Sequence, residues 1–316
     1  MTDVLTSLNF SDVPTVNNVL MAMPNDELVL NKDDTPATPG NEQVRLFGKE
    51  IASRMFPAFV GPSGMDVAIQ PAIWRQKLAR WNPPGNATTL PAVDGMNAPT
   101  ALGTATVRNV ATTNLFTRTK RLGYVSSGTS NNFAGHYSTI SQFTTGDGAG
   151  LGGFFYSCRF GATDAATVAA ARMFVGMTFM TSVPTNVEPS SILNQIGVAQ
   201  LSTSSTQLYI VYGGSTAQAA IPLGTNFPPM AAAGVTNGVA YDFTVFCPPS
   251  ANGVINYRLE RIGTSFFVEG TITPTTVGVQ TPASTVLLGH RAWRTNNTTG
   301  LAVGLDVLGV YIETDY

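Results

Sequence analysis

The sequence is poor in charged residues. Only 11% of its 316 residues are Asp, Glu, Lys or Arg, against roughly a quarter in an average globular domain. The formal net charge is −2, so the chain has no overall positive field to hold a nucleic acid backbone. We therefore expect no nucleic acid partner, and the low charge suits surfaces that pack against other subunits or face sugars.

Cysteine and long apolar runs are also scarce. The two cysteines, Cys158 and Cys247, are too few for a disulfide framework in a chain of this length, and both lie in apolar strand-like patterns, where a free cysteine acts as a small buried hydrophobe. No run approaches the ~18 apolar residues of a membrane-spanning helix, and the first residues do not resemble a secretory signal. We expect synthesis in a cytoplasm and no membrane insertion.

Motifs that carry catalysis or cofactor binding are missing. The histidines His136 and His290 stand alone, without H-E-x-x-H or C-x-x-C spacing, and are predicted as turn or interface residues. The glycine string from Gly148 to Gly153 matches G-x-G-x-x-G, but a predicted strand follows it where phosphate binding requires a helix. The prediction is a protein that is not an enzyme, with no cofactor and no metal.

The clearest feature that is present is a run of three strands from Tyr241 to Thr273. Apolar residues alternate with polar ones from Tyr241 to Cys247, and again from Ile255 to Glu260. A third strand places Phe266, Val268 and Ile272 on one side, and turn residues separate the three runs. This pattern predicts an antiparallel meander that is buried on one face.

Strand patterns continue over most of the chain after residue 100. They cover residues 107–110, 115–125, 140–144, 154–160, 173–179, 196–201, 208–212, 286–290 and 302–312. A short helical turn is expected at Glu188 to Leu193, and a change of phase at Leu308 predicts a β-bulge in the last strand. The fold class is therefore mainly β, with a C-terminal β-sandwich (jelly roll, lectin-like) over residues 101–316.

The first hundred residues follow a different pattern. Residues 1–45 contain no long periodic segment and are predicted to be an extended arm or a pair of short strands, docked on the protein's own trimer or on a neighbouring protein. Residues 46–100 are predicted to form a connector with one or two short helices, one within residues 41–55 and one from about 72 to 80, because apolar residues follow helical spacing there.

A run from Arg291 to Asn297 is the best candidate for ligand binding. Trp293 offers a flat apolar face for a sugar ring, while Arg291, Arg294, Asn296 and Asn297 offer donors for hydroxyl groups. We predict that these five residues lie in a loop between two strands and bind a glycan. The alternative is that Trp293 plugs the end of the sandwich.

Two other groups of charged residues could bind a partner or act in catalysis. The basic cluster of Arg118, Lys120 and Arg121 is placed on a strand, where it meets either an anionic polysaccharide or, as we favour, acidic residues of a neighbouring subunit. Six acidic residues could supply a glycosidase pair, although solvated strand positions on the meander explain Asp242, Glu260 and Glu269 better. The six are Asp147, Asp164, Glu188, Asp242, Glu260 and Glu269.

Several phrases of the sequence resemble a family of tailed-bacteriophage tail fibre or minor tail proteins. They are Leu46-Phe47-Gly48, Pro57 to Gly64, Trp81 to Thr89, Arg172 to Gly176, Asn186 to Ser190 and Tyr311 to Tyr316. The resemblance implies a homotrimer located in the virion, with an N-terminal part bound to the particle and a C-terminal lectin-like jelly roll that faces the host.

The predicted function is that of a structural virion fibre protein. Residues 1–45 would attach it to other tail or neck proteins, and the sandwich would contact a glycan of the host surface. One alternative is a collar, neck or head fibre or decoration protein that binds no receptor. The other is a tailspike that degrades polysaccharide.

Overall fold

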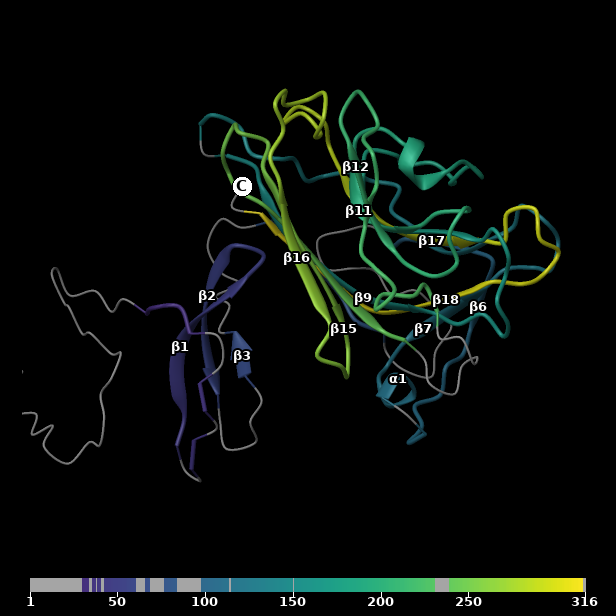
Figure 1. Ribbon diagram of the computed structural model, residues 1–316, viewed down its shortest axis with the longest axis horizontal. Helices are drawn as coiled ribbons and strands as arrows, with labels where there is room; N and C mark the ends of the chain where they lie inside the picture. The colour runs from purple at the N-terminus through teal and green to yellow at the C-terminus, as the bar shows by residue number, and fades with distance from the viewer. Residues whose placement is uncertain are drawn as a thin grey trace, which may run out of the picture. The chain divides into compact units, whose positions relative to one another are not determined.

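The computed structural model describes residues 30–33, 36–37, 39–40, 43–60, 66–68, 77–83, 98–113, 115–149, 151–230 and 239–314 (Figure 1). The chain divides into two compact units, residues 1–71 and 72–316. Each unit is described by itself below. The domain boundaries predicted at residues 45 and 100 stay predictions.

The first unit contains a small antiparallel sheet. Its strands are β1 (Arg45–Ile51), β2 (Arg54–Val60) and β3 (Asp66–Ala68), in the order β1-β2-β3. Lys32 bridges to Gly48 of β1, and its ammonium lies 3.1 Å from the carboxylate of Glu50. Residues 1–29 of the predicted arm lie outside the described residues.

The helix predicted within residues 41–55 is wrong. The chain reverses instead at Ala52 and Ser53, which both adopt positive φ (50° and 63°), and Ile51 pairs with Arg54. Positive φ at both central residues is the geometry of a tight hairpin turn. The apolar spacing fitted a helix, but pairing with a second strand and with Lys32 is long-range information that a local pattern does not contain.

The second unit is a sandwich of two antiparallel sheets. The seven-stranded sheet has the order β13-β12-β11-β10-β17-β8-β5. Its strands are β5 (Thr100–Leu102), β8 (Phe133–Tyr137), β10 (Arg172–Thr178), β11 (Gln195–Gln200), β12 (Tyr209–Gly213), β13 (Ile221–Pro222) and β17 (Gly289–Thr295).

The second sheet has the order β16-β15-β14-β9-β18-β7-β6, and β4 also pairs with β18. Its strands are β4 (Lys77–Trp81), β6 (Thr104–Thr106), β7 (Leu122–Val125), β9 (Phe154–Ala162), β14 (Tyr241–Cys247), β15 (Ile255–Arg261), β16 (Phe267–Ile272) and β18 (Gly304–Thr314). We call this the eight-stranded sheet.

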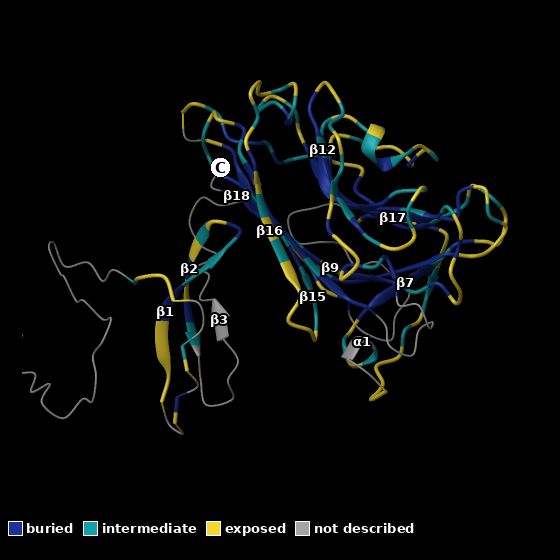
Figure 2. Cartoon of the chain, in the orientation of Figure 1, coloured by how far each residue is buried: buried dark blue, intermediate teal, exposed yellow. Residues whose placement is uncertain are grey.

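The predicted mainly-β sandwich is confirmed. Successive strands β7, β8, β9 and β10 alternate between the two sheets, as do β17 and β18, so the sheets are connected many times. Figure 2 shows that the middle strands of both sheets are buried while the connecting loops are mostly exposed. The core between the sheets is apolar and contains residues such as Phe160, Met173 and Leu305.

The predicted meander is confirmed as β14, β15 and β16, which pair in sequence. Tyr241, Phe243 and Val245 are fully buried, as the period of two requires. The prediction for Phe266 is wrong, because this residue precedes β16 and is exposed. Val268 and Ile272 pack against the core as predicted.

Other local predictions were partly right. The 3₁₀ helix η3 (Pro189–Ser191) lies within the predicted turn at 188–193. Residues 77–81 form β4 and not a helix, since they pair with residues 310–314 of β18. Residues 107–110 lie outside any strand, and the predicted strand 115–125 begins as the four-residue helix α1 (Leu115–Arg118) before β7. Of two further predicted strands, 140–144 and 286–290, the first contains only an isolated bridge from Phe143 to Leu288, and the second ends in the first two residues of β17.

The bulge predicted in the last strand is confirmed. The register of β18 against β9 shifts between Val307 and Gly309. Val307 and Val310 stay in the main core, while Leu308 packs in a separate small cluster with Ala240 and Ile262. The extra residue thus keeps both halves of the strand facing the core correctly.

Both cysteines are free thiols buried in the core, Cys158 in β9 and Cys247 in β14. The prediction that they act as buried apolar residues is confirmed. Burial raises the pKa of the Cys158 thiol to about 12, so it is not a reactive thiolate at neutral pH. No helix in the described part of the chain is long and apolar enough to cross a membrane.

Candidate functional site

The five residues predicted to form a glycan-binding loop are buried. Arg291, Trp293 and Arg294 belong to strand β17, and Asn296 and Asn297 follow it directly. None of the five is more than 7% exposed. The prediction of an exposed loop is therefore wrong, because pairing with β8 and β10 places β17 inside the seven-stranded sheet. The glycan-binding role itself stays a prediction.

Four of these five side chains have a structural role that the contacts explain. Trp293 packs on Phe133 and Phe174, with ring centroids 5.7 and 6.5 Å away. This agrees with the alternative of a packing role for Trp293, although it lies on the outer face of the sheet and not at the end of the sandwich. Arg294 donates to both carboxylate oxygens of Asp164 at 2.5–3.1 Å.

The two asparagines hold neighbouring loops in place. The Asn296 amide nitrogen donates to the carbonyl oxygens of Ser127, Thr129 and Leu301 at 3.3, 2.8 and 2.9 Å. The Asn297 amide oxygen accepts a hydrogen bond from Arg172 at 3.0 Å. The Asn296 bonds satisfy backbone carbonyl groups that would otherwise be costly to bury.

The histidines form a buried pair inside the sandwich, so the prediction of turn or interface positions is wrong. The Nε2 atoms of His136 and His290 lie 2.8 Å apart, and Nδ1 of His290 lies 3.0 Å from the Tyr156 hydroxyl. Burial lowers the pKa of His136 to about 4 and that of His290 well below its usual value, so both are neutral at pH 7. Their neighbours are aromatic, including Trp81 and Tyr124.

Most of the acidic candidates are ion-paired. Asp164 pairs with Arg294, Glu188 with Arg172 and Asp242 with Arg159, while Glu260 and Glu269 share Arg258. The last two carboxylates are the nearest to a glycosidase pair, but the side chains are 43% exposed and lie on an open sheet face. A glycosidase acid needs an apolar site that keeps it protonated.

The basic cluster is dispersed. Arg118 ends α1 and donates to the Thr112 carbonyl, so it is not on a strand. Arg121 and Arg108 instead bind Asp306 of the same chain, at 2.9 and 3.2 Å. The acidic partner expected from a neighbouring subunit is thus internal for these two arginines.

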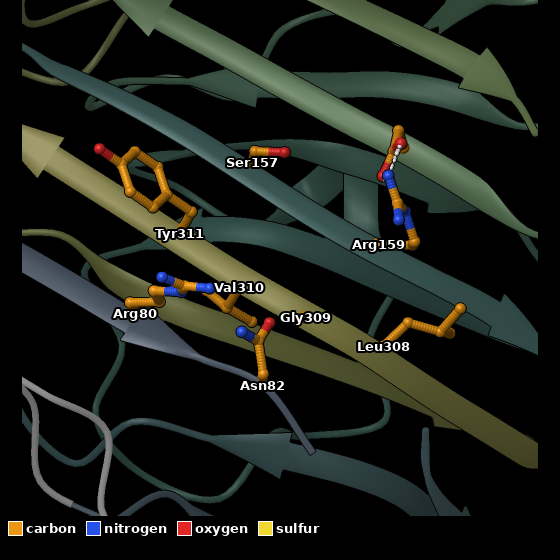
Figure 3. A pocket seen from close by; sticks show the side chains of 9 residues that line it. Arg80, Asn82, Ser157, Arg159, Leu308, Gly309, Val310 and Tyr311 are labelled. Carbon is orange, nitrogen blue, oxygen red and sulfur yellow. Dashed lines mark hydrogen bonds and ion pairs between the residues drawn. The ribbon is translucent and has the colours of Figure 1, made fainter. Parts of the chain in front are cut away.

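An open groove lies on the outer face of the eight-stranded sheet (Figure 3). Its volume is about 200 Å³, below the roughly 300–1,000 Å³ of drug-sized ligand sites, so it suits one small polar unit such as a sugar ring. It is formed by strands β4, β9, β14 and β18. The lining residues are Arg80, Asn82, Ser157, Arg159, Asp242, Leu308, Gly309, Val310 and Tyr311.

Strand register explains why these residues meet. Tyr311 of β18 pairs with Arg80 on one side and with Ser157 on the other. Gly309 pairs with Arg159, which in turn pairs with Asp242 of β14. Directly paired residues project from the same face of a sheet, so the polar side chains gather around the bulge in β18.

Gly309 keeps the groove open. A Cβ atom placed there would lie 3.1 Å from the terminal amide group of Asn82 and 3.6 Å from the Trp81 carbonyl oxygen. The absence of a side chain therefore leaves a gap between Asn82 and Arg159 (Figure 3). Larger side chains at this position would fill the space that a ligand needs.

The groove offers donors, an acceptor and an aromatic ring. Arg159 donates two hydrogen bonds to Asp242, at 2.8 and 2.5 Å, and this contact raises the Arg159 pKa. With its oxygen turned towards Arg80, the Asn82 amide accepts from Nη2 and Nε at 3.1 and 3.3 Å. Two guanidinium groups against one carboxylate leave a net positive charge, which suits neutral or acidic sugars.

The sequence contains one signal for the groove residues, although none of them was predicted to bind a ligand. Arg80 was assigned to a helix, and Arg159 was one polar residue among many on a predicted strand. The phase change at Leu308 was detected, however, and bulges are common next to binding sites. What the pattern lacked was the pairing of β4 with β18.

Among the described residues, no group of three or more His, Cys, Asp or Glu side chains could hold a metal ion. The expectation of no cofactor stays a prediction. The structure thus shows a β-sandwich with an open, polar groove on the outer face of the eight-stranded sheet.

Comparisons with known proteins add fold neighbours of low similarity. No family model and no curated protein sequence matches the chain. Peanut lectin aligns with 76% of this chain and 97% of its own, at 11% identity and a TM-score of 0.47. Lectin II from Ulex europaeus aligns with 69% of this chain and 93% of its own, at 13% identity and a TM-score of 0.44.

A protein of unknown function from Shewanella oneidensis MR-1 aligns with 76% of this chain and 86% of its own, at 13% identity and a TM-score of 0.43. All three TM-scores are below 0.5. These likenesses therefore carry no argument about the function of this chain.

Proposed function

We propose that this protein is a non-catalytic glycan-binding protein whose ligand occupies the groove beside Gly309. The observation that carries the proposal is the open, side-chain-free gap between two arginines and an asparagine on a rigid sheet. Side chains fixed on paired strands hold a binding geometry better than those on loops. The ring of Tyr311 supplies a wall for the apolar face of a sugar.

We further propose that the sandwich is the head of a trimeric virion fibre of a tailed bacteriophage. The support is the sequence resemblance and the low charge of the chain. In this proposal the first 45 residues bind other virion proteins, and the head contacts glycan on the host surface. Light scattering on the purified protein tests the trimer, because the mass should be three times 33.3 kDa; a monomer would contradict it.

The binding proposal is tested on an array of bacterial surface glycans with the full-length protein. Wild type should bind a subset of glycans, and Arg80→Gln should lose at least tenfold in affinity because it removes a charged donor from the groove. Arg258→Gln is the matched control, since Arg258 lies on the eight-stranded sheet but does not line the groove. An equal loss of affinity in both variants would contradict the proposal that the groove is the binding site.

The same glycans separate the alternatives. Release of reducing sugar from a bound glycan would favour a polysaccharide-degrading spike. No binding to any array glycan or to susceptible cells would favour a decoration protein without a receptor. Binding without cleavage is the result that we expect.

A further inference from the structure

Arg291 is a buried cation without a buried anion beside it. It is 1% exposed and lies on the outer face of the seven-stranded sheet, opposite Tyr137 of β8 and Gly176 of β10. Burial lowers its pKa to about 10, so the guanidinium still carries its proton at pH 7. Among the described residues, no carboxylate oxygen lies within 4.0 Å of its nitrogens.

The guanidinium is also short of hydrogen-bond partners. Of its five N–H donors, one donates to the Ser182 carbonyl, and Nη1 lies 3.9 Å from the sulfur of Met180, a weak acceptor. Nε has no partner. The Tyr137 ring, 5.4 Å from Cζ, adds a cation–π contact but no negative charge. A buried charge in this state is costly unless something else neutralises it.

A thin segment separates Arg291 from solvent. We call residues Met180–Val183 the strap; residues 181–183 in it are exposed. The Ser182 carbonyl makes the one hydrogen bond that joins residues 181–183 to the rest of the described chain, and its donor is Arg291. A segment held this weakly opens at low free-energy cost, so its opening would expose the guanidinium.

Two further unpartnered polar atoms lie on the same face of this sheet. Trp293 Nε1 and Gln195 Oε1 are both buried without a hydrogen bond. Trp293 is two residues along β17 from Arg291, and Gln195 is two residues along β11 from Gly197, which lies in the same row as Gly176. An unpartnered donor and an unpartnered acceptor would match a ligand that carries hydroxyl groups.

We propose that Arg291 is the anion-binding residue of a second ligand site, gated by the strap, and that its ligand is the carboxylate of an acidic sugar. In the closed state the Ser182 carbonyl oxygen accepts a hydrogen bond from the guanidinium. In the bound state the carboxylate replaces this carbonyl and accepts two parallel hydrogen bonds from the planar fork. One carboxylate balances one buried cation, whereas a phosphate would bring close to two negative charges.

The first test uses the wild-type protein and phenylglyoxal, which modifies accessible arginines. Modification of Arg291, located by mass spectrometry, should slow at least tenfold in saturating sodium D-glucuronate at constant ionic strength. Neither D-glucose nor sodium sulfate should protect it. Absence of protection by glucuronate, or equal protection by sulfate, would overturn the proposal.

The second test uses thermal shift with glucuronate. Wild type should show a saturable rise in melting temperature, Arg291→Met should lose it, and Arg258→Met should keep it as the matched control. Arg291→Met is expected to fold, because an apolar side chain of similar length replaces an uncompensated buried charge. Full retention of the shift in Arg291→Met would overturn this site.

These outcomes are distinct from those for the groove. Glucuronate that binds beside Gly309 would still stabilise Arg291→Met and would lose its effect in Arg80→Gln, which supports the proposed function and contradicts the second site. A carboxylate of a second protein copy is another source of the same chemistry. In that case the Arg291 modification rate would fall with protein concentration and glucuronate would not change it, which would also contradict the proposal.

Discussion

Two arginines three residues apart on β17 have opposite surroundings. Arg291 and Arg294 are both 1% exposed. Arg294 faces Asp164, which accepts bidentate hydrogen bonds, and the Gln200 amide oxygen at 2.5 Å. Within the described part of the chain, Arg291 has one backbone carbonyl and one sulfur atom as contacts and no carboxylate.

Arg294 therefore carries a structural charge, whereas the charge of Arg291 is available to bind a ligand. Asp164 also accepts a hydrogen bond from the backbone of Gly304 at 2.8 Å, so the Arg294 pair ties β17 to the start of β18. Arg291, in contrast, joins the seven-stranded sheet only to the strap, whose residues 181–183 have no other hydrogen bond to the rest of the described chain. The sequence alone presents two equivalent hydrogen-bond donors. In the structure Arg294 is occupied by Asp164, so we place the proposed ligand at Arg291.

The largest expected effect comes from removing each arginine in turn. Arg294→Met should lower the free energy of unfolding by about 3–5 kcal/mol, because it leaves Asp164 buried and unpaired. Arg291→Met should change it by less than about 1 kcal/mol, or raise it, since no charge is left behind. Urea unfolding measures both, and equal losses for the two variants would contradict the comparison.

A smaller effect should follow from giving Arg291 an internal carboxylate. Met180→Glu places one near Nη1, which now lies 3.9 Å from the Met180 sulfur. A charge-assisted hydrogen bond there should raise the free energy of unfolding by roughly 1.5–3 kcal/mol. Met180→Gln is the neutral control of equal length. A gain of the same size in both variants would show that charge is not the cause.

The buried histidine pair is a third case of buried basic side chains. Unlike the two arginines, the histidines lose their protons at neutral pH and are buried without charge. The pKa of His136 is lowered in the folded state to about 4. In the unfolded chain His136 has its ordinary pKa near 6.5. When the pH falls below this value, the unfolded chain binds a proton at His136 that the folded chain does not bind, so the free energy of unfolding falls with pH. At pH 5.5, His136 alone should cost about 1.4 kcal/mol relative to pH 8.

Urea unfolding between pH 8 and pH 5 measures this loss. His136→Gln removes one titrating group and should give a shallower slope. An unchanged slope in that variant would contradict a neutral buried pair.

Much of the fold followed from the sequence because strand periodicity is local. The meander, the bulge at Leu308 and the turn at Pro189 were all visible as changes of pattern over a few residues. The helices predicted within residues 41–55 and from about 72 to 80 fall where the structure has strands, because the apolar spacing there fits both structures and the strand partners lie elsewhere in the chain. Long-range pairing decided these segments against local preference.

The site was much harder to predict. Trp293 and its flanking residues were selected for the chemistry of their side chains, but their burial depends on the strands that pair with β17 on either side. Arg80 and Arg159 come from strands that are far apart in sequence and meet only through β18. The bulge was the one feature in the sequence that marked this place.

The central claim is that the groove beside Gly309 binds glycan. The most direct measurement is the affinity of Gly309→Val, compared with wild type, for the glycan that wild type binds best on the array. A valine should fill the gap to Asn82 and weaken binding at least tenfold, with the melting temperature little changed. Unaltered affinity in a folded Gly309→Val protein would contradict the account.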